Sequence, residues 1–207
     1  MTTLTKAQRE RIRATVEAAE AKTSGEFVCV VARQADGYRY IATLVAAIAA
    51  LLAGGLFVAI PHGITVSAVE LFEGQAVLFV LLAALVHWTK LRLLVVPRGV
   101  RHARAHLLAR KAFLDLGLAD TPERNAVLLF VSLGERYVEI TADSGLQRHL
   151  DNAVWEKIVT DFVAAVKAGR VVEGFEAAIA ACTDIMATHY PNRPDAPNLL
   201  PDHLIEL

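Results

Sequence analysis

The sequence predicts a small α/β/α sandwich with a mixed sheet, interrupted by a two-helix transmembrane hairpin. Two long apolar stretches, residues 41–60 and 71–88, lie inside the chain. Short apolar stretches with the composition of buried strands lie on either side of them, at residues 26–32 and 126–131. Amphipathic stretches with helical spacing flank these strands. This order of elements is typical of an α/β domain split by an insertion.

The composition agrees with membrane association. Of the 207 residues, 55% are hydrophobic, and the mean hydropathy of +0.41 is high for a soluble protein. The only cysteines, Cys29 and Cys182, lie far apart in apolar runs. We therefore expect buried free thiols in a reducing compartment rather than a disulfide. The charged first 22 residues lack the apolar core of a signal peptide.

The opening segment predicts a helix followed by a strand. Thr5 and Gln8 have the spacing of a capping box. The inward positions of the helix follow at helical spacing: Ile12, Val16 and Ala19. Residues 26–32 then predict a buried strand, and this strand must pair with strands beyond the hairpin because a single strand is not stable alone. Two membrane crossings return the chain to the same side.

The two apolar stretches predict a transmembrane hairpin. Residues 41–60 contain no charged side chain, and twenty helical residues span about 30 Å, the thickness of the hydrocarbon core. In residues 71–88 the acidic side chain of Glu73 lies near the start, followed by an unbroken apolar run over residues 76–86. Side chains near a helix end reach the membrane surface, so we interpret Glu73 as interfacial.

The basic residues predict the orientation. The loop at residues 61–70 has no Lys or Arg, whereas residues 89–111 carry seven and no acidic residue. By the positive-inside rule the soluble domain and both termini are cytoplasmic, on a multi-pass protein of the inner (cytoplasmic) membrane. Nucleic acid is not an expected partner, because this run lacks stacking aromatics. The side chains expected to contact lipid headgroups are Lys90, Arg92, Arg98, Arg101 and Arg104.

The second half predicts a helix and a β-hairpin. Residues 101–116 have helical spacing, with the helix ending at Gly117. Its expected apolar positions are Leu107, Leu108, Ala112, Phe113 and Leu116. Residues 126–131 and 136–141 predict two strands joined by a turn at Leu133 and Gly134. Alternation in the second strand places Val138 on one face and Glu139 on the other.

Two further helices and a tail complete the chain. Asp151 or Asn152 caps a helix that runs to about residue 167, and the last helix ends near residue 190. Residues 1–36 and 98–190 are then the two parts of one domain, with the hairpin at 37–90. Residues 191–207 form a Pro-rich tail, in which we expect no stable structure before Leu204 and Ile205.

The β-hairpin also predicts a candidate metal site. A two-residue turn places Asn125 opposite Ala142, and Glu123 opposite Ser144. Oxygen-bearing side chains then gather at one end of the hairpin: Glu123, Asn125 and Asp143, with Asp120 as a further candidate. Ca²⁺ and Mg²⁺ bind such sets of loop oxygens. The alternative is that these residues serve only as turn and cap residues.

His102 and His106 form a second candidate pair. Their spacing of four residues places them on one helix face, which can bind zinc, but neither an HExxH motif nor a nearby cysteine accompanies them. We therefore interpret this face as basic and solvated, beside anionic headgroups.

Residues 121–146 resemble the core of the TPM domain family. The shared pattern is an apolar Val-Leu-Leu strand, a Glu-Arg turn, a Val-x-Ile strand and Asp-x-Gly, here ending at Asp143 and Gly145. Gly169, Gly174 and Phe175 are similar to the glycine pattern before the family's last helix. The chain departs from many members at Asn125-Ala126, where those members have Asn-Gly. The family includes plant thylakoid proteins of photosystem repair and many bacterial membrane proteins.

The resemblance implies an α/β/α sandwich and two classes of function. Some members bind divalent metals and have a weak acid phosphatase activity, and others are assembly or accessory factors of membrane complexes. The first hypothesis is an accessory or interaction module of a membrane complex, with or without bound Ca²⁺ or Mg²⁺. The second is a metal-assisted hydrolase in which Glu123, Asn125 and Asp143 hold the ion. We favour the first, because no nucleophile is evident and the catalytic residues are unknown.

Overall fold

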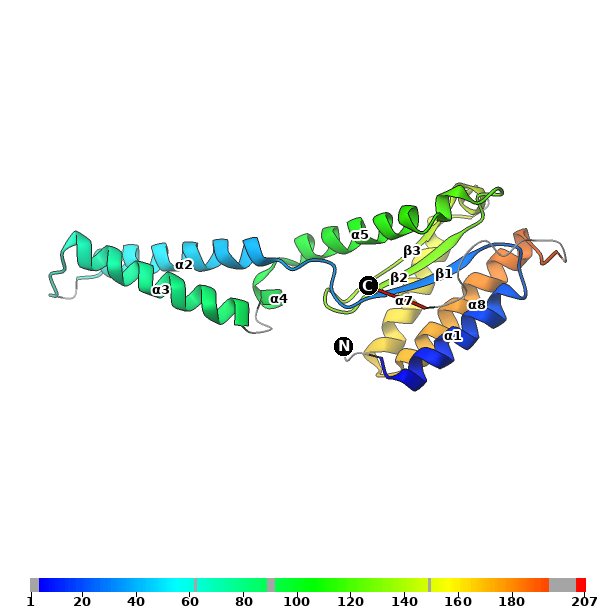
Figure 1. Cartoon of the computed structure of the whole chain (residues 1–207), viewed down its shortest axis with the longest axis horizontal. Coiled ribbons are helices and arrows are strands. Elements are labelled where there is room, and N and C mark those ends of the chain that lie inside the picture. The colour runs from blue at the N-terminus through cyan, green and yellow to red at the C-terminus, as the bar shows by residue number, and fades with distance from the viewer. Residues whose placement is uncertain (1–3, 62, 89–91, 149, 194–203) are drawn as a thin grey trace. The chain divides into compact units, whose positions relative to one another are not determined.

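The chain folds into two compact units. The computed structural model describes residues 4–61, 63–88, 92–148, 150–193 and 204–207, apart from the side chain of Arg92. One unit contains the residues up to Ala35 together with those from His102 onward, and the other is Asp36–Arg101 (Figure 1).

The first unit is built on a mixed four-stranded sheet of order β3-β2-β1-β4. β1 (Phe27–Ala32) pairs in parallel with β2 (Val127–Ser132), and β2 pairs antiparallel with β3 (Tyr137–Ala142). Every residue of β1 and β2 is buried, as expected for central strands with helices on both faces. The predicted α/β fold with a mixed sheet is confirmed.

Three helices cover one face of this sheet (Figure 1). They are α1 (Lys6–Glu20), α7 (Asn152–Lys167) and α8 (Val171–His189). The predicted capping box is present, because Thr5 Oγ1 accepts from Gln8 N at 3.3 Å and Thr5 N donates to Gln8 Oε1 at 2.9 Å. The rings of Phe162 and Phe175 meet edge to face, with centroids 4.9 Å apart, between α7 and α8.

The opposite face is covered by α5 (Arg98–Asp115), where the predicted Leu108, Ala112, Phe113 and Leu116 belong to the core but Leu107 does not. The contact with the sheet uses small side chains, Ala105, Ala109 and Ala112, together with Phe113. Leu107 was predicted to face inward, but it is 55% exposed. Alanines allow the helix axis to approach the strands closely, so the stripe of small residues, and not the leucine, marks the inner face.

The β2–β3 turn is longer than predicted. Four residues, 133–136, separate the strands, with Arg136 in the left-handed region at φ 54°. Val127 therefore lies opposite Ala142, and the predicted pairings of Asn125 with Ala142 and of Glu123 with Ser144 are wrong by two residues. The turn is held by the buried carboxylate of Glu135, which accepts hydrogen bonds from Ser132 Oγ and from Ala35 N.

Both cysteines are buried free thiols, as expected. Burial raises the pKa of Cys29 above its usual range, and it raises the pKa of Cys182 to about 12. Neither thiol therefore forms the reactive thiolate near neutral pH.

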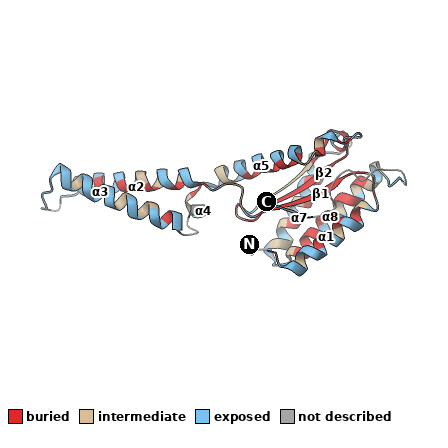
Figure 2. Cartoon of the chain, viewed as in Figure 1, coloured by how far each residue is buried: buried red, intermediate tan, exposed pale blue. Residues whose placement is uncertain are grey.

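The second unit is a helical hairpin of α2 (Arg39–Ala59) and α3 (Ala68–Trp88), followed by the short α4 (Arg92–Val95). The buried positions of α2 recur every four residues: Ala42, Ala46, Ala50 and Gly54. Such a stripe of small residues allows two apolar helices to pack closely. The remaining faces of both helices are mostly exposed (Figure 2).

α3 begins three residues earlier than the predicted segment. Ser67 and Glu70 form a second capping box, in which Ser67 N donates to Glu70 Oε2 at 2.7 Å and Glu70 N donates to Ser67 Oγ at 3.2 Å. These two bonds satisfy amide groups that have no partner within the helix.

Two short helices and one strand complete the first unit: η1 (Leu118–Asp120), α6 (Ser144–Gln147) and β4 (Ile205–Glu206). β4 pairs in parallel with β1, opposite Val30 and Val31. The tail therefore docks at the predicted position, whereas residues 194–203 lie outside the described residues.

Gly145, at the start of α6, lies against the loop before β2. A Cβ at this position would lie 2.5 Å from Arg124 O, 2.6 Å from Glu123 O and 2.8 Å from Tyr190 Oη. Two of these atoms belong to the backbone, so they cannot rotate away as the end of a side chain can. Only glycine fits here without moving the loop.

We predict that Gly145→Ala destabilises the protein by about 1–3 kcal/mol, the range for overpacking a filled site. The measurement is the melting temperature of the purified chain, with Gly99→Ala as the control because nothing lies within 4 Å of that position. Equal melting temperatures for the two variants would contradict the close approach.

We also predict that Gly54→Leu separates α2 from α3. A Cβ at Gly54 would lie within 2.8 Å of Gln75 Cγ, whereas one at Gly55 meets nothing within 4 Å. Both substitutions gain the same helix propensity, so a difference between the melting temperatures of the two variants reports the packing of α2 against α3. In mild detergent, the melting temperature of Gly54→Leu should fall below that of Gly55→Leu. The reverse order would show that the small-residue stripe does not form the contact.

Candidate functional site

Asp143 is the central residue of the predicted metal site. It precedes α6 and caps it, since its Oδ1 accepts from Ser144 N at 2.6 Å. Its side chain is 8% exposed, and its Oδ2 lies 3.4 Å from Arg124 Nε. Oδ2 has no hydrogen-bond partner among the described residues. A buried carboxylate oxygen is therefore balanced by one guanidinium charge without a hydrogen bond.

Arg124 is positioned by the loop before β2. Its backbone is left-handed, at φ 54°, and its N donates to Thr121 O at 3.1 Å while its carbonyl accepts from Gly145 N at 2.9 Å. Its side chain turns back and donates to Ala119 O. The guanidinium consequently lies beside Oδ2 of Asp143, the carboxylate oxygen that has no hydrogen-bond partner among the described residues.

Asn125 is buried, and its side chain joins the segment before β2 to the segment before β1. Its Nδ2 donates to Ser24 O at 3.2 Å, and the next residue, Ala126, accepts from Asp143 N at 2.9 Å. The hydroxyl oxygens of Ser24 and Thr121 are buried without a hydrogen-bond partner among the described residues. This end of the sheet is therefore rich in oxygen atoms, several of them with free bonding capacity.

The remaining predicted ligands are not part of this cluster. Glu123 forms an ion pair with Arg193, with Oε1 2.8 Å from Nη1. Asp120 is exposed at the end of η1. Throughout the described part of the chain, no three side chains of His, Cys, Asp or Glu lie close enough to hold a metal ion. The arrangement as it stands does not fit Ca²⁺ or Mg²⁺, because Arg124 and Arg193 hold the carboxylates that the ion would need.

His106 is part of a polar cluster between α5 and β3. Its Nδ1 lies 2.9 Å from Glu139 Oε2, and Tyr137 Oη donates to the same carboxylate at 2.8 Å. Burial raises the pKa of Tyr137 above its usual range, and the hydrogen bond to Glu139 adds to this effect, so the phenol remains a donor. The ring of His102 lies against that of Tyr137, with centroids 5.3 Å apart.

This cluster was not anticipated from the sequence. Both histidines are exposed, in agreement with the predicted solvated face, but their side chains also contact residues of β3. The alternation that placed Glu139 and Tyr137 on one face of β3 was the available signal, because Glu139 contacts His106 and Tyr137 contacts His102.

The basic residues predicted to contact lipid headgroups are only partly described. Arg98 and Arg104 lie on the first two turns of α5 with exposed side chains, and Arg101 is partly buried. Lys90 lies outside the described residues, and of Arg92 only the backbone in α4 is described. Their contact with lipid stays a prediction.

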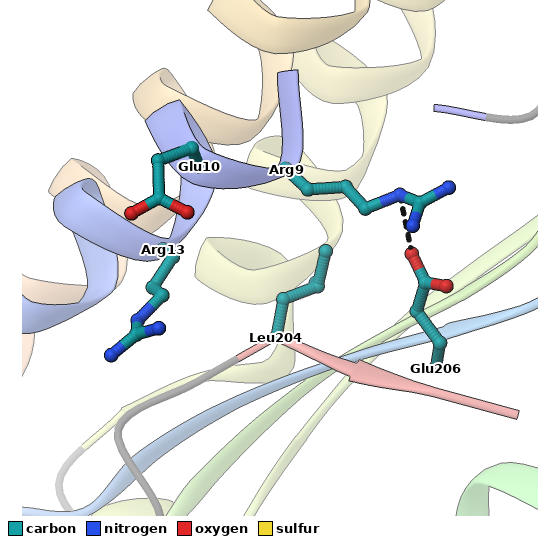
Figure 3. Close-up of a pocket in the computed structure, with 5 residues that line it drawn as sticks. All are labelled: Arg9, Glu10, Arg13, Leu204 and Glu206. Carbon is teal, nitrogen blue, oxygen red and sulfur yellow. Dashed lines mark ion pairs between the residues drawn. The ribbon is translucent and has the colours of Figure 1, made fainter. Parts of the chain in front are cut away.

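A cavity of about 400 Å³ lies between α1 and β4 (Figure 3). The side chains that line it are Arg9, Glu10, Arg13, Leu204 and Glu206. Arg9 Nε lies 2.8 Å from Glu206 Oε1, and the guanidinium also donates to Leu4 O at 3.0 Å. The last strand of the sheet is thus joined to the first helix by a half-exposed ion pair.

The comparisons with known proteins find a family match for part of the chain. The family model described as the TPM domain matches residues 87–185. The solved NMR structure of the BA42 protein from the psychrophilic bacterium Bizionia argentinensis is similar, with a TM-score of 0.60 and 14% sequence identity, covering 100% of this chain and 97% of that one. At this identity the likeness concerns the fold alone. No curated protein matches the sequence. Residues 87–185 therefore match the TPM domain family, and the α/β fold of the chain agrees with this match.

Proposed function

We propose that this chain is a membrane-anchored TPM domain that acts as an interaction module on the cytoplasmic side of the inner membrane. The observation that carries the proposal is the exposure of apolar side chains on α2 and α3. Only 22% of the apolar stretch in α2 and 6% of that in α3 are buried within the chain. A core helix of a soluble protein of this length would be mostly buried. A lipid bilayer removes these side chains from water.

The charge distribution supports the proposed orientation. The connection between α2 and α3 carries no Lys or Arg, while basic residues precede α2 and follow α3. Positive charge on both flanks favours a cytoplasmic position for the TPM domain and an external position for the connection.

We expect the intact chain to remain in the membrane pellet after alkaline carbonate extraction. The membrane orientation is tested with two single-cysteine substitutions. Thr65→Cys introduces a thiol in the α2–α3 connection, and Asp161→Cys introduces one at an exposed position of α7. The native cysteines are buried, so they give little background. A membrane-impermeant maleimide should label Thr65→Cys in intact cells and Asp161→Cys only after lysis. Recovery of the chain in the soluble fraction would refute the anchor, and the opposite labelling would refute the orientation.

The ion pairs of the acidic residues favour an interaction module over a metal-assisted hydrolase. Arg124 neutralises Asp143, and Arg193 neutralises Glu123. A metal-assisted phosphohydrolase needs these carboxylates free for an ion that polarises a phosphoryl oxygen. An interaction module needs only a stable surface, and such ion pairs order the loops at this end of the domain.

Divalent-ion binding stays a prediction, and Arg124 provides its test. If Asp143 can take a cation, Arg124 competes with it, so removing the guanidinium should strengthen binding. We expect saturating Ca²⁺ to add about 1–3 kcal/mol to the stability of Arg124→Ala, a rise in melting temperature of roughly 2–8 °C at this chain length. Wild type should respond less.

The control for this titration is the double variant Arg124→Ala/Asp143→Asn. It also lacks the guanidinium, but it replaces the Asp143 carboxylate by a neutral amide of the same size. Its melting temperature should not depend on Ca²⁺. An equal response of wild type and both variants would exclude Asp143 as the ion's ligand, and no response in any of them would remove the ion site from the proposal.

A further inference from the structure

Among the described residues, the outer edge of β1 is covered by β4, and over part of its length. β1 pairs with β2 along all six residues, whereas β4 pairs with Val30 and Val31 alone. Two hydrogen bonds continue the pairing, from Leu207 N to Val31 O at 3.1 Å and from Arg33 N to Leu207 O at 2.8 Å. The unpaired edge of an apolar strand is a template for another strand. Here a segment distant in sequence fills that position.

The side chains of this segment are bound on both faces of the sheet. Leu204 packs against the core formed with α1, α7 and α8, and Ile205 packs against the core formed with α5. Glu206 returns to the α1 side, where Arg9 binds its carboxylate (Figure 3). Backbone pairing combined with alternating side-chain contacts is the recognition mode of domains that bind peptides by strand addition.

The contact is small enough to be reversible. Arg9 and Glu206 are each about half exposed, at 45% and 44%, and such ion pairs add little stability. The cavity of about 400 Å³ beside Leu204 shows that β4 does not fill the groove between α1 and the sheet. A segment held by few bonds at the sheet edge opens more readily than the strands in the core.

We propose that the outer edge of β1, together with Arg9 of α1, is a docking site for an extended peptide with the pattern apolar–apolar–acidic–apolar. Residues 204–207 are its resident occupant, and a segment of a partner protein with the same pattern replaces them. This site is separate from the carboxylates considered above, and it depends neither on an ion nor on insertion of α2 and α3 in a membrane.

The test uses the full chain in detergent and a variant that lacks residues 204–207. The probe is a fluorescein-labelled peptide with the sequence of residues 202–207, followed by fluorescence anisotropy. A tethered strand competes at an effective concentration on the order of millimolar. The truncated variant should therefore bind the peptide at least about fivefold more tightly than the full chain. Equal binding, or no binding to a truncated variant that keeps its melting transition, would overturn the proposal.

A charge exchange tests the recognition by Arg9. A peptide with the Glu206→Lys change should bind the truncated chain more weakly, and Arg9→Glu in that chain should restore the binding. The matched control is Arg13→Glu, which changes the charge beside the same cavity at a residue that pairs with Glu17 of its own helix. If Arg9→Glu and Arg13→Glu restored binding of the altered peptide equally, the effect would come from overall charge. That result would contradict a contact between Arg9 and the acidic position of the peptide.

Hydrogen exchange in the full chain gives a readout that does not depend on truncation. The Arg33 amide is bonded to Leu207 O, and the Leu133 amide is bonded to Ala32 O at 2.9 Å. If β4 leaves its site while the domain stays folded, the Arg33 amide should exchange at least about tenfold faster than the Leu133 amide. Equal protection would mean that the strand leaves only when the domain unfolds, and would overturn the proposal.

Discussion

The parallel pairing of β1 with β2 is the interaction on which the rest of the structure depends. The two strands align residue by residue from Phe27 with Val127 to Ala32 with Ser132, and neither exposes a side chain. Parallel neighbours need a crossover connection on one face of the sheet, and α5 supplies it. β3 and β4 are the two edge strands of the sheet, and each pairs with one strand of this central pair.

This crossover also explains how the hairpin can be inserted without disturbing the domain. Ala35 N is bonded to Glu135 in the β2–β3 turn at 3.0 Å, and His102 lies against Tyr137 at the start of β3. The chain therefore leaves the α/β domain and re-enters it at the same end of the sheet. An insertion there needs no change in the core, because both connection points lie on the surface of the domain.

The sequence predicts the elements of this protein better than their contacts. Capping at Thr5 and Asp151, the apolar strands and the long hairpin helices follow from local patterns and agree with the structure. The β2–β3 register was missed because Arg136 adopts a left-handed conformation that favours glycine, so the turn is longer than the glycine position suggests. The pairing of the acidic residues in the candidate metal site could not be predicted, for a different reason. Local spacing brings carboxylates to one end of a hairpin, but it does not reveal that arginines from a loop and from beyond α8 bind them.

The distance in sequence between β1 and β2 has a consequence for biosynthesis. Phe27 and its partner Val127 are 100 residues apart (127 − 27), so at roughly 5–20 residues per second the ribosome needs about 5–20 s to supply the second strand. During that interval α2 and α3 have already emerged, while the apolar β1 has no neighbour. The apolar β1 segment of the nascent chain must therefore be protected from aggregation until the rest of the domain has been translated.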